Sequence, residues 1–261
     1  ILQEDGSRIT EFTFEDYVIL KGKRKLEGLP AVYTESDEEA ETLEIYLRDR
    51  VMNTKIILSY TIFENLPVII RNTRFVHEGE SSIVLERAMS LNLDLPDDRY
   101  EMVELTGAWA RERYVKTAPL HEGIQAIYSM RGHSSHQFNP FFALKRPETT
   151  EDAGEAIGIS LVYSGNFLGQ TAVDTFGVAR AMIGIHPEGF SWTLKKGETF
   201  QTPEAVLVYS GEGLGKMSRT FHRLYRKRLA RGSHLYELYR RENPEIRGNS
   251  PSTRGRDDGA R

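Results

Sequence analysis

The sequence contains no cysteine, and this absence removes three kinds of site at once. Disulfide scaffolds, cysteine-ligated zinc and thiol nucleophiles all depend on that side chain. A chain without cysteine is also compatible with a reducing compartment, and we expect a cytoplasmic protein.

Long apolar runs and an excess of one charge are missing as well. No segment has the length and apolar character of a membrane span. The net charge of −4 arises from 34 basic and 38 acidic residues that form no dominant block. We therefore expect neither nucleic acid nor a membrane as a partner, and a neutral or small partner fits better.

What the sequence does contain is a series of short strand patterns. Apolar and period-two runs recur between turn signals, which is typical of a mainly β fold built as a large antiparallel sandwich. The clearest strands are expected at 43–47, 56–63, 68–76, 83–93, 157–163, 169–174, 178–185 and 205–209. Turns at Asn65–Pro67 and His77–Glu80 would join three of them into a meander. Lys195–Glu198 would be the turn of a further hairpin, between Trp192 and Phe200.

The pattern changes to that of a helix near the end of the chain. Apolar residues at three- and four-residue steps predict an amphipathic helix over Leu214–Leu229 with a basic, solvated opposite face. Regular patterning is lost beyond Gly232, and 247–261 hold hardly any apolar group. We therefore divide the chain into a β-supersandwich domain at 1–212, an amphipathic linker helix at 213–231 and an irregular or disordered tail at 232–261.

The first residues suggest that the chain is a piece of a longer one. It begins at Ile1 without methionine, and Leu2 precedes a turn-like Asp5-Gly6 as the end of a strand would. We expect the true start to lie upstream and the opening strands of the domain to be missing. The sheet edge left unpaired predicts lowered solubility or self-association.

Polar groups are concentrated between Gly107 and Leu144, where a tryptophan, several arginines and two histidines stand close together. In a structural interpretation, the aromatic side chains fill a core while the polar ones satisfy backbone groups at strand ends. The aromatic residues concerned are Trp109, Phe138, Phe141 and Phe142, and the polar ones are Arg111, Arg113, Ser134 and Gln137.

These and other polar residues do not complete a known catalytic site. His133–His136 offers two imidazoles without a third metal ligand, and its Ser134 has no evident orienting group or oxyanion hole. The carboxylates of Asp37–Glu39 and Glu151–Asp152 fit solvated loops, whereas Glu204 heads a strand and is placed to satisfy buried backbone donors. We expect no catalytic residue, no metal and no cofactor in this chain.

Seven short blocks of the sequence together resemble a known domain family. They are Lys25–Pro30, Ala40–Ile45, Gly107–Arg113, Ser134–Gln137 with Asn139-Pro140, Leu161–Phe167, Phe200–Glu204 and Phe221–Tyr225. In content, order and spacing they resemble the N-terminal domain of glycoside hydrolase family 36 α-galactosidases. The resemblance covers about residues 10–232, and so many co-linear blocks are more specific than any single motif.

The resemblance implies a β-supersandwich that precedes a (β/α)8 catalytic barrel, with the helix leading toward it. Enzymes of this family hydrolyse terminal α-galactosides such as raffinose and melibiose with retention of configuration, and they use two aspartates of the barrel. The family's Lys-Trp-Asp-Met-Asn nucleophile motif has no match, since Trp109 is followed by Ala and Trp192 by Thr. The chain departs from the family after Gly232. We expect a fragment without the barrel that is inactive alone.

The resemblance also gives the polar segment a second interpretation. Some of its residues would face the barrel, or reach the rim of a sugar pocket, where aromatic platforms and bidentate donors are common. The candidates are Trp109, Arg111, Arg131, His136, Gln137 and Asn139. We favour interface packing over direct sugar contact. The implied partners are the catalytic barrel, an α-galactoside bound by the full-length enzyme, and further copies in a homo-oligomer.

Two functions of other classes stay open. A stand-alone carbohydrate-binding sandwich would need a groove lined by exposed aromatic residues, and Trp109, Tyr114, Tyr128 or Trp192 are available for one. A pure oligomerisation module would need only contacts between subunits. Heat on titration with galactose or raffinose is expected of the binding module alone.

Overall fold

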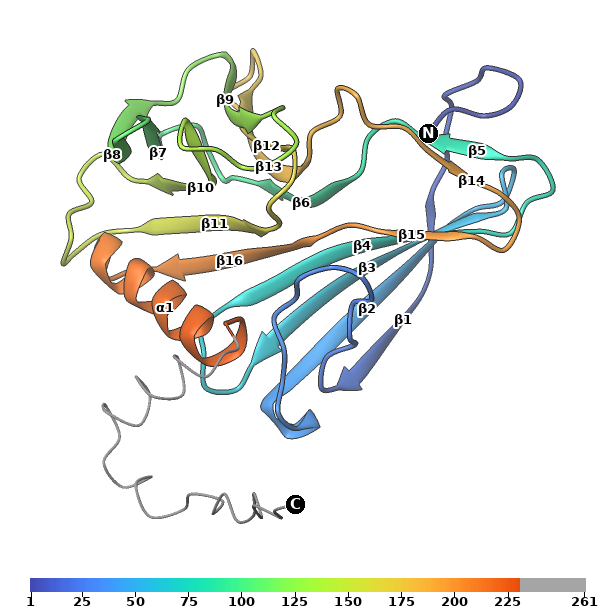
Figure 1. The fold of residues 1–261 in the computed structure, drawn as a ribbon, viewed down its shortest axis with the longest axis horizontal. Helices are drawn as coiled ribbons and strands as arrows, with labels where there is room; N and C mark the ends of the chain where they lie inside the picture. Colours follow the sequence, from blue (N-terminus) through green and yellow to red (C-terminus); the bar gives the residue numbers. More distant parts are fainter. Residues whose placement is uncertain (231–261) are drawn as a thin grey trace, which may run out of the picture.

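The computed structural model describes residues 1–230. The tail predicted at 232–261 lies outside these residues. Within them the fold is mainly β, as the sequence predicts, with antiparallel sheets and one α-helix near the end (Figure 1).

A ten-stranded antiparallel sheet forms the largest layer. Its strands are β1 (Thr13–Lys21), β2 (Ala40–Asp49), β3 (Thr54–Phe63), β4 (Ile69–His77), β7 (Glu101–Ala108), β8 (Arg111–Pro119), β10 (Phe138–Lys145), β11 (Ala156–Val162), β15 (Thr199–Gln201) and β16 (Glu204–Ser210). They lie in the order β1, β2, β3, β4, β16, β11, β10, β7, β8, and β15 also pairs with β4. The last strand within residues 1–230, β16, therefore lies in the middle of the sheet.

A second layer covers part of one face of this sheet. Its strands are β6 (Met89–Asp94), β9 (Gly123–Ser129), β12 (Phe167–Val173) and β13 (Ala179–Ile185), with the short pair β5 (Ile83–Leu85) and β14 (Trp192–Leu194) beside them. The main core lies between the layers, where Phe142, Phe167 and Ile127 are fully buried. Alternating apolar residues of both layers thus form the sandwich that the period-two patterns predict.

The helix α1 (Gly213–Arg228) packs on the opposite face of the large sheet, across β11 and β16 (Figure 1). Met217, Phe221 and Leu224 are buried there in a second core cluster. Of the basic residues in the last turn, Arg226 and Lys227 are exposed, whereas Arg228 is half-buried and pairs with Glu39 Oε1 at 2.6 Å. The predicted helix is thus present, and its apolar face shares a core with the sheet. No helix within residues 1–230 is long and apolar enough to cross a membrane.

Two local predictions about strand connections are wrong. The strand expected at 83–93 is interrupted after Leu85, and its halves, β5 and β6, belong to different sheets. The meander therefore consists of β2, β3 and β4, without the third strand expected after His77. Lys195–Glu198 does form a turn, but β14 pairs with β5 and β15 with β4, so no hairpin forms. At both places the chain crosses between layers, which local turn chemistry does not encode.

Among the described residues, β1 is an edge strand that pairs only with β2, so one side of the large sheet is unpaired. Phe14, Tyr17 and Ile19 are exposed on it, and every residue of the strand except Leu20 is exposed. The self-association expected from the sequence stays a prediction, and exposed apolar side chains on an edge strand favour it. Light scattering should show a mass that rises with protein concentration for the wild-type chain and less so for Ile19→Lys. A constant monomer mass would contradict the prediction.

Arg146 holds a polar cluster together beyond the end of β10. Its guanidinium donates to Asp97 Oδ1 at 2.6 Å and to Glu155 Oε1 at 3.1 Å, and it lies 3.9 Å from the centre of the Tyr100 ring. The hydrogen bond from Arg146 lowers the pKa of Asp97 from 3.8 to about 2. Burial, together with its hydrogen bond to Glu155, raises the pKa of Tyr100 to about 12.

Asp97 is expected to make stability depend on pH in the acid range. Because its pKa is lower in the folded state, its contribution is present above pH 3.8 and is lost as the pH falls toward about 2. The difference in urea midpoint between the wild-type chain and Asp97→Asn should therefore shrink over that window. Asp152→Asn, in an exposed turn, should show no such convergence. If the difference in urea midpoint between the wild-type chain and Asp97→Asn stayed constant down to pH 2, the lowered pKa of Asp97 would be refuted.

Candidate functional site

The polar segment between Gly107 and Leu144 forms much of a surface groove, which we name the β8–β9 groove. It lies where β8, an outer strand of the large sheet, approaches β9, an outer strand of the four-stranded sheet (Figure 1). Its volume is about 680 Å³. The polar and aromatic side chains that line it include Arg111, Tyr114, Lys116, Tyr128, Arg131 and Gln137.

The structure brings only some of the predicted contact residues together. Arg111, Arg131 and Gln137 line the groove, whereas His136 and Asn139 do not. Trp109 is also outside it, at the turn between β7 and β8. The set of six is thus divided between the groove and its surroundings.

The assignment of Trp109 to a core is wrong, because 84 % of its surface is exposed. It stands in a tight turn between Ala108 and Arg111, which pair with each other, and Ala110 has a φ of 62°. A two-residue turn projects beyond the sheet, so no layer covers the indole. Phe142 does fill the core, as predicted, and Phe138 packs partly against it.

The groove carries positive charge and exposed aromatic rings. Within residues 1–230, the guanidinium groups of Arg111 and Arg131 form neither an ion pair nor a hydrogen bond, and no carboxylate lines the groove. Tyr114 and Tyr128 are each half exposed or more. Retaining glycoside hydrolysis needs two carboxylates about 5 Å apart, so the groove is suited to contact rather than to that reaction.

The segment with the histidines is held by backbone contacts. Ser134 N–H donates to Ser164 O at 2.7 Å, and Gly132 N–H donates to Asn166 Oδ1 at 2.7 Å. The Nδ1 atom of His133 lies 3.2 Å from Arg131 O. No three metal-ligating side chains converge anywhere in the described part of the chain. These contacts give the segment a defined shape without giving Ser134 a base.

Gly107 allows three segments to meet beside the groove. A Cβ at this position would lie 2.6 Å from Arg111 O and 2.9 Å from His136 O, and Gly107 N–H donates to Gln137 O at 3.1 Å. Only a residue without a side chain fits there.

Gly107→Ala is therefore expected to lower the free energy of unfolding by about 1–3 kcal/mol, because backbone atoms must move apart. Chemical denaturation followed by circular dichroism measures this loss. Gly211→Ala is the matched control, because its Cβ would meet only Tyr209 Oη, at 3.9 Å. Equal losses for the two variants would argue against close packing at Gly107.

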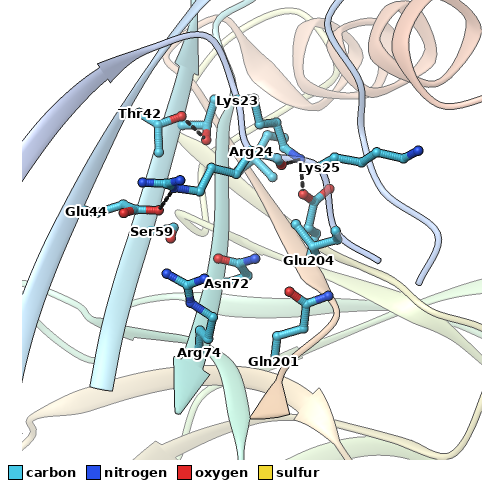
Figure 2. A pocket seen from close by; sticks show the side chains of 13 residues that line it. Lys23, Arg24, Lys25, Thr42, Glu44, Ser59, Asn72, Arg74, Gln201 and Glu204 are labelled. Carbon is cyan, nitrogen blue, oxygen red and sulfur yellow. Dashed lines mark hydrogen bonds and ion pairs between the residues drawn. The ribbon is translucent and has the colours of Figure 1, made fainter. Parts of the chain in front are cut away.

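A second, smaller site lies on the face of the large sheet that carries α1, and we name it the Asn72 cavity (Figure 2). Its volume is about 60 Å³. The strand register places Glu44, Ser59 and Asn72 in one row across β2, β3 and β4, and Arg74 follows Asn72 on the same face of β4. The segment after β1 covers this row.

Two ion pairs form the walls of the Asn72 cavity. Lys23 pairs with Glu204, and their side chains are 5 % and 1 % exposed. Glu204 Oε2 also accepts the Val32 N–H at 2.7 Å, which confirms that this carboxylate satisfies a buried backbone donor. Burial raises the pKa of Glu204, and the nearby Lys23 ammonium opposes this shift. The second pair joins Arg24 Nε to Glu44 Oε1 at 2.7 Å.

Sequence reasoning identified Glu204 but missed the rest of this cavity. The available signal was a polar residue at every second position of strands, as at Thr42 and Glu44 or at Asn72 and Arg74. That alternation is also typical of a solvent-facing sheet surface. Only the strand order shows that these residues meet under one loop.

Two family models match the chain. The model of the glycosyl hydrolase family 36 N-terminal domain matches residues 1–195, and the melibiase model matches residues 199–244. Together they extend the similarity at both ends beyond the range 10–232 that the sequence blocks suggest. The melibiase match continues past Gly232, where we expected the chain to depart from the family, and ends at residue 244.

Characterised relatives and solved structures agree with these matches. The chain is 50 % identical over 230 residues to alpha-galactosidase AgaA of Geobacillus stearothermophilus. This alignment covers 88 % of the chain and 32 % of AgaA. It is 40 % identical over 249 residues to alpha-galactosidase 1 of Pediococcus pentosaceus, covering 95 % of the chain and 33 % of that protein. A crystal structure of a doubly substituted variant of AgaA in complex with stachyose matches with a TM-score of 0.88 and 49 % identity, covering 90 % of the chain and 33 % of that variant. The chain spans about a third of the length of these relatives.

Proposed function

Since the chain belongs to the glycoside hydrolase family 36 N-terminal domain family, we propose that it is the non-catalytic N-terminal part of a longer α-galactosidase. The relatives that it matches are about three times as long. The melibiase match that follows the N-terminal-domain match supports a continuation into a catalytic domain. In this proposal the barrel supplies the two aspartates that hydrolyse terminal α-galactosides, with substrates of the raffinose and stachyose type.

The proposed role of the chain is to support the barrel and contact neighbouring subunits. The observation that carries this role is the unusual surface around the β8–β9 groove, where Trp109 projects into solvent and Arg111 and Arg131 have no partner within residues 1–230. Exposed aromatic and arginine side chains are enriched at protein interfaces, where they often dominate binding. We infer that this surface meets the barrel or a second subunit, and that part of it reaches the rim of the sugar pocket.

The absence of catalysis is tested with the chain alone. The purified 261-residue chain should release no nitrophenol from the α-galactoside of p-nitrophenol. A chimera in which this chain replaces the aligned N-terminal third of AgaA should hydrolyse the same substrate. Hydrolysis by the isolated chain would overturn the proposal, and so would a soluble, folded chimera that is inactive.

The contact surface is tested in the same chimera. Trp109→Ala and Arg111→Ala should lower kcat/KM or dissociate the oligomer, as measured by steady-state kinetics and light scattering. Phe176→Ala is the matched control, because this ring is 89 % exposed and lies outside the groove. Unchanged kinetics and mass for both groove variants would remove the interface from the proposal.

A stand-alone carbohydrate-binding sandwich remains the second candidate. Tyr114 and Tyr128 give the β8–β9 groove exposed aromatic rings of the kind that such a module needs. The matches to much longer enzymes favour the first proposal. Calorimetric titration of the chain with raffinose should show no heat, and saturable heat that Tyr128→Ala abolishes would instead support the binding module.

A further inference from the structure

The Asn72 cavity contains a buried polar atom without a partner. Asn72 is only 9 % exposed, and its Oδ1 atom is fully buried yet accepts no hydrogen bond from any of residues 1–230. Buried acceptors are nearly always satisfied in folded proteins. Figure 2 shows the amide among Ser59, Arg74 and Gln201 inside the cavity. We therefore expect Asn72 Oδ1 to accept a hydrogen bond from an O–H or N–H group that does not belong to residues 1–230.

The charges that line the cavity do not cancel. Glu204 is paired with Lys23, and Glu44 is paired with Arg24, so these four side chains together contribute no net charge. Arg74 is half-buried and forms no ion pair or hydrogen bond within residues 1–230. Lys25 also lines the cavity, but it is exposed and Figure 2 shows its ammonium pointing away from Asn72. Arg74 is therefore the uncompensated cation beside Asn72 Oδ1, which has neither a hydrogen bond nor an ion pair among the described residues.

The hydrogen bonds of the two carboxylates limit what else they can bind. Glu44 Oε2 accepts from Tyr46 Oη at 2.7 Å, and its other oxygen accepts from Arg24. Glu204 accepts from Val32 N–H and faces the Lys23 ammonium. Gln201 Nε2 donates to Glu27 O at 3.1 Å, and the Lys25 ammonium points away from the cavity (Figure 2). Since both carboxylates are already engaged by donors, a ligand would meet Arg74, Asn72 and the hydroxyl of Ser59, which has no hydrogen bond of its own among the described residues.

The size of the cavity restricts the ligand further. One water molecule needs roughly 10–15 Å³ of cavity volume. The Asn72 cavity, at about 60 Å³, therefore has room for a few waters or for one small molecule as large as those waters together. A hexose ring is too large for it. A tetrahedral oxyanion with its five heavy atoms has a suitable size.

We propose that the Asn72 cavity binds a small oxyanion that carries a hydroxyl, such as hydrogen phosphate. Arg74 donates to its anionic oxygens, the Ser59 hydroxyl donates to another oxygen, and the hydroxyl of the ligand donates to Asn72 Oδ1. This arrangement compensates the free cation and satisfies the buried acceptor together. The proposal is independent of whether the chain works within a longer enzyme.

The need for a ligand hydroxyl gives a selective test. Phosphate carries at least one O–H at pH 6.5, whereas sulfate carries none, so sulfate can engage Arg74 but cannot satisfy Asn72 Oδ1. In a buffer without other oxyanions, calorimetric titration of the chain should show one site that prefers phosphate over sulfate by at least about tenfold, which corresponds to 1.4 kcal/mol. Glycolate, a small carboxylate with a hydroxyl, should compete with phosphate for this site.

Variants separate the roles of the two main groups. Arg74→Gln should weaken phosphate binding at least about tenfold, and Asn72→Leu should reduce the preference for phosphate over sulfate to about one. Ser59→Ala, a smaller change, should weaken phosphate binding without unfolding the chain. Arg180→Gln is the matched control, because this arginine pairs with Asp94 on the surface and should leave phosphate binding unchanged.

Three results would overturn the proposal. One is the absence of saturable phosphate binding up to tens of millimolar, which would leave ordered water as the occupant. The second is equal affinity for phosphate and sulfate in the wild-type chain. The third is unchanged phosphate binding by Ser59→Ala and Arg74→Gln when circular dichroism shows that both are folded.

Discussion

Glu204→Ala is expected to lower the free energy of unfolding by about 3–5 kcal/mol, because it leaves a buried ammonium without its counter-ion. The Lys23 side chain is 5 % exposed and has no other acidic partner among the described residues. The substitution also removes the acceptor of the Val32 N–H. Denaturant unfolding followed by circular dichroism measures the loss.

Two comparisons show whether the buried charge is the cause. The double variant Lys23→Met/Glu204→Gln removes both charges and keeps an acceptor near Val32, so it should be clearly more stable than Glu204→Ala. Glu212→Ala breaks an exposed pair with Lys216 and should change stability by about 0–1 kcal/mol. If the double variant were as unstable as Glu204→Ala, the loss would have to come from packing.

Leu224→Ala is expected to lower the free energy of unfolding by about 2–5 kcal/mol, because a fully buried side chain leaves a cavity between α1 and the sheet. The whole cooperative transition should move to lower denaturant concentration, since the apolar face of α1 shares a core cluster with Val206 and Ala143. His222→Ala, on the exposed face of the helix, should change stability by at most about 0.5 kcal/mol. A separate early transition of the helix in Leu224→Ala would contradict this integration.

Periodicity in the sequence predicts α1 and most strands because their side chains face one core with a regular step. The helix expected at Leu214–Leu229 is observed at Gly213–Arg228, and the strand expected at 56–63 lies within β3. Pairing between strands is less accessible, since it depends on contacts far apart in the chain. Nothing local distinguishes β14 and β15 from the two arms of a hairpin, although they belong to different layers.

For the candidate sites, too, the sequence reveals what depends on local composition and not what depends on contacts between distant segments. The unusual content of the segment after Gly107 indicates a functional surface, and three of the six predicted contact residues, Arg111, Arg131 and Gln137, do meet in the β8–β9 groove. The exposure of Trp109 depends on how far its turn extends beyond the sheet, which composition does not reveal. The Asn72 cavity is built from β2, β3, β4 and β16, so its existence depends on a strand order that joins residues more than 150 positions apart.

The central place of β16 sets an order of events during synthesis on the ribosome. β4 and β11 lie on either side of β16, so the two halves of the large sheet have no strand between them until residues 204–210 leave the exit tunnel. Until then the nascent chain holds two unjoined half-sheets, each with an open inner edge that other chains can pair with. Protection of these edges by chaperones would therefore affect the yield of folded protein more than it would for a sheet assembled in sequence order.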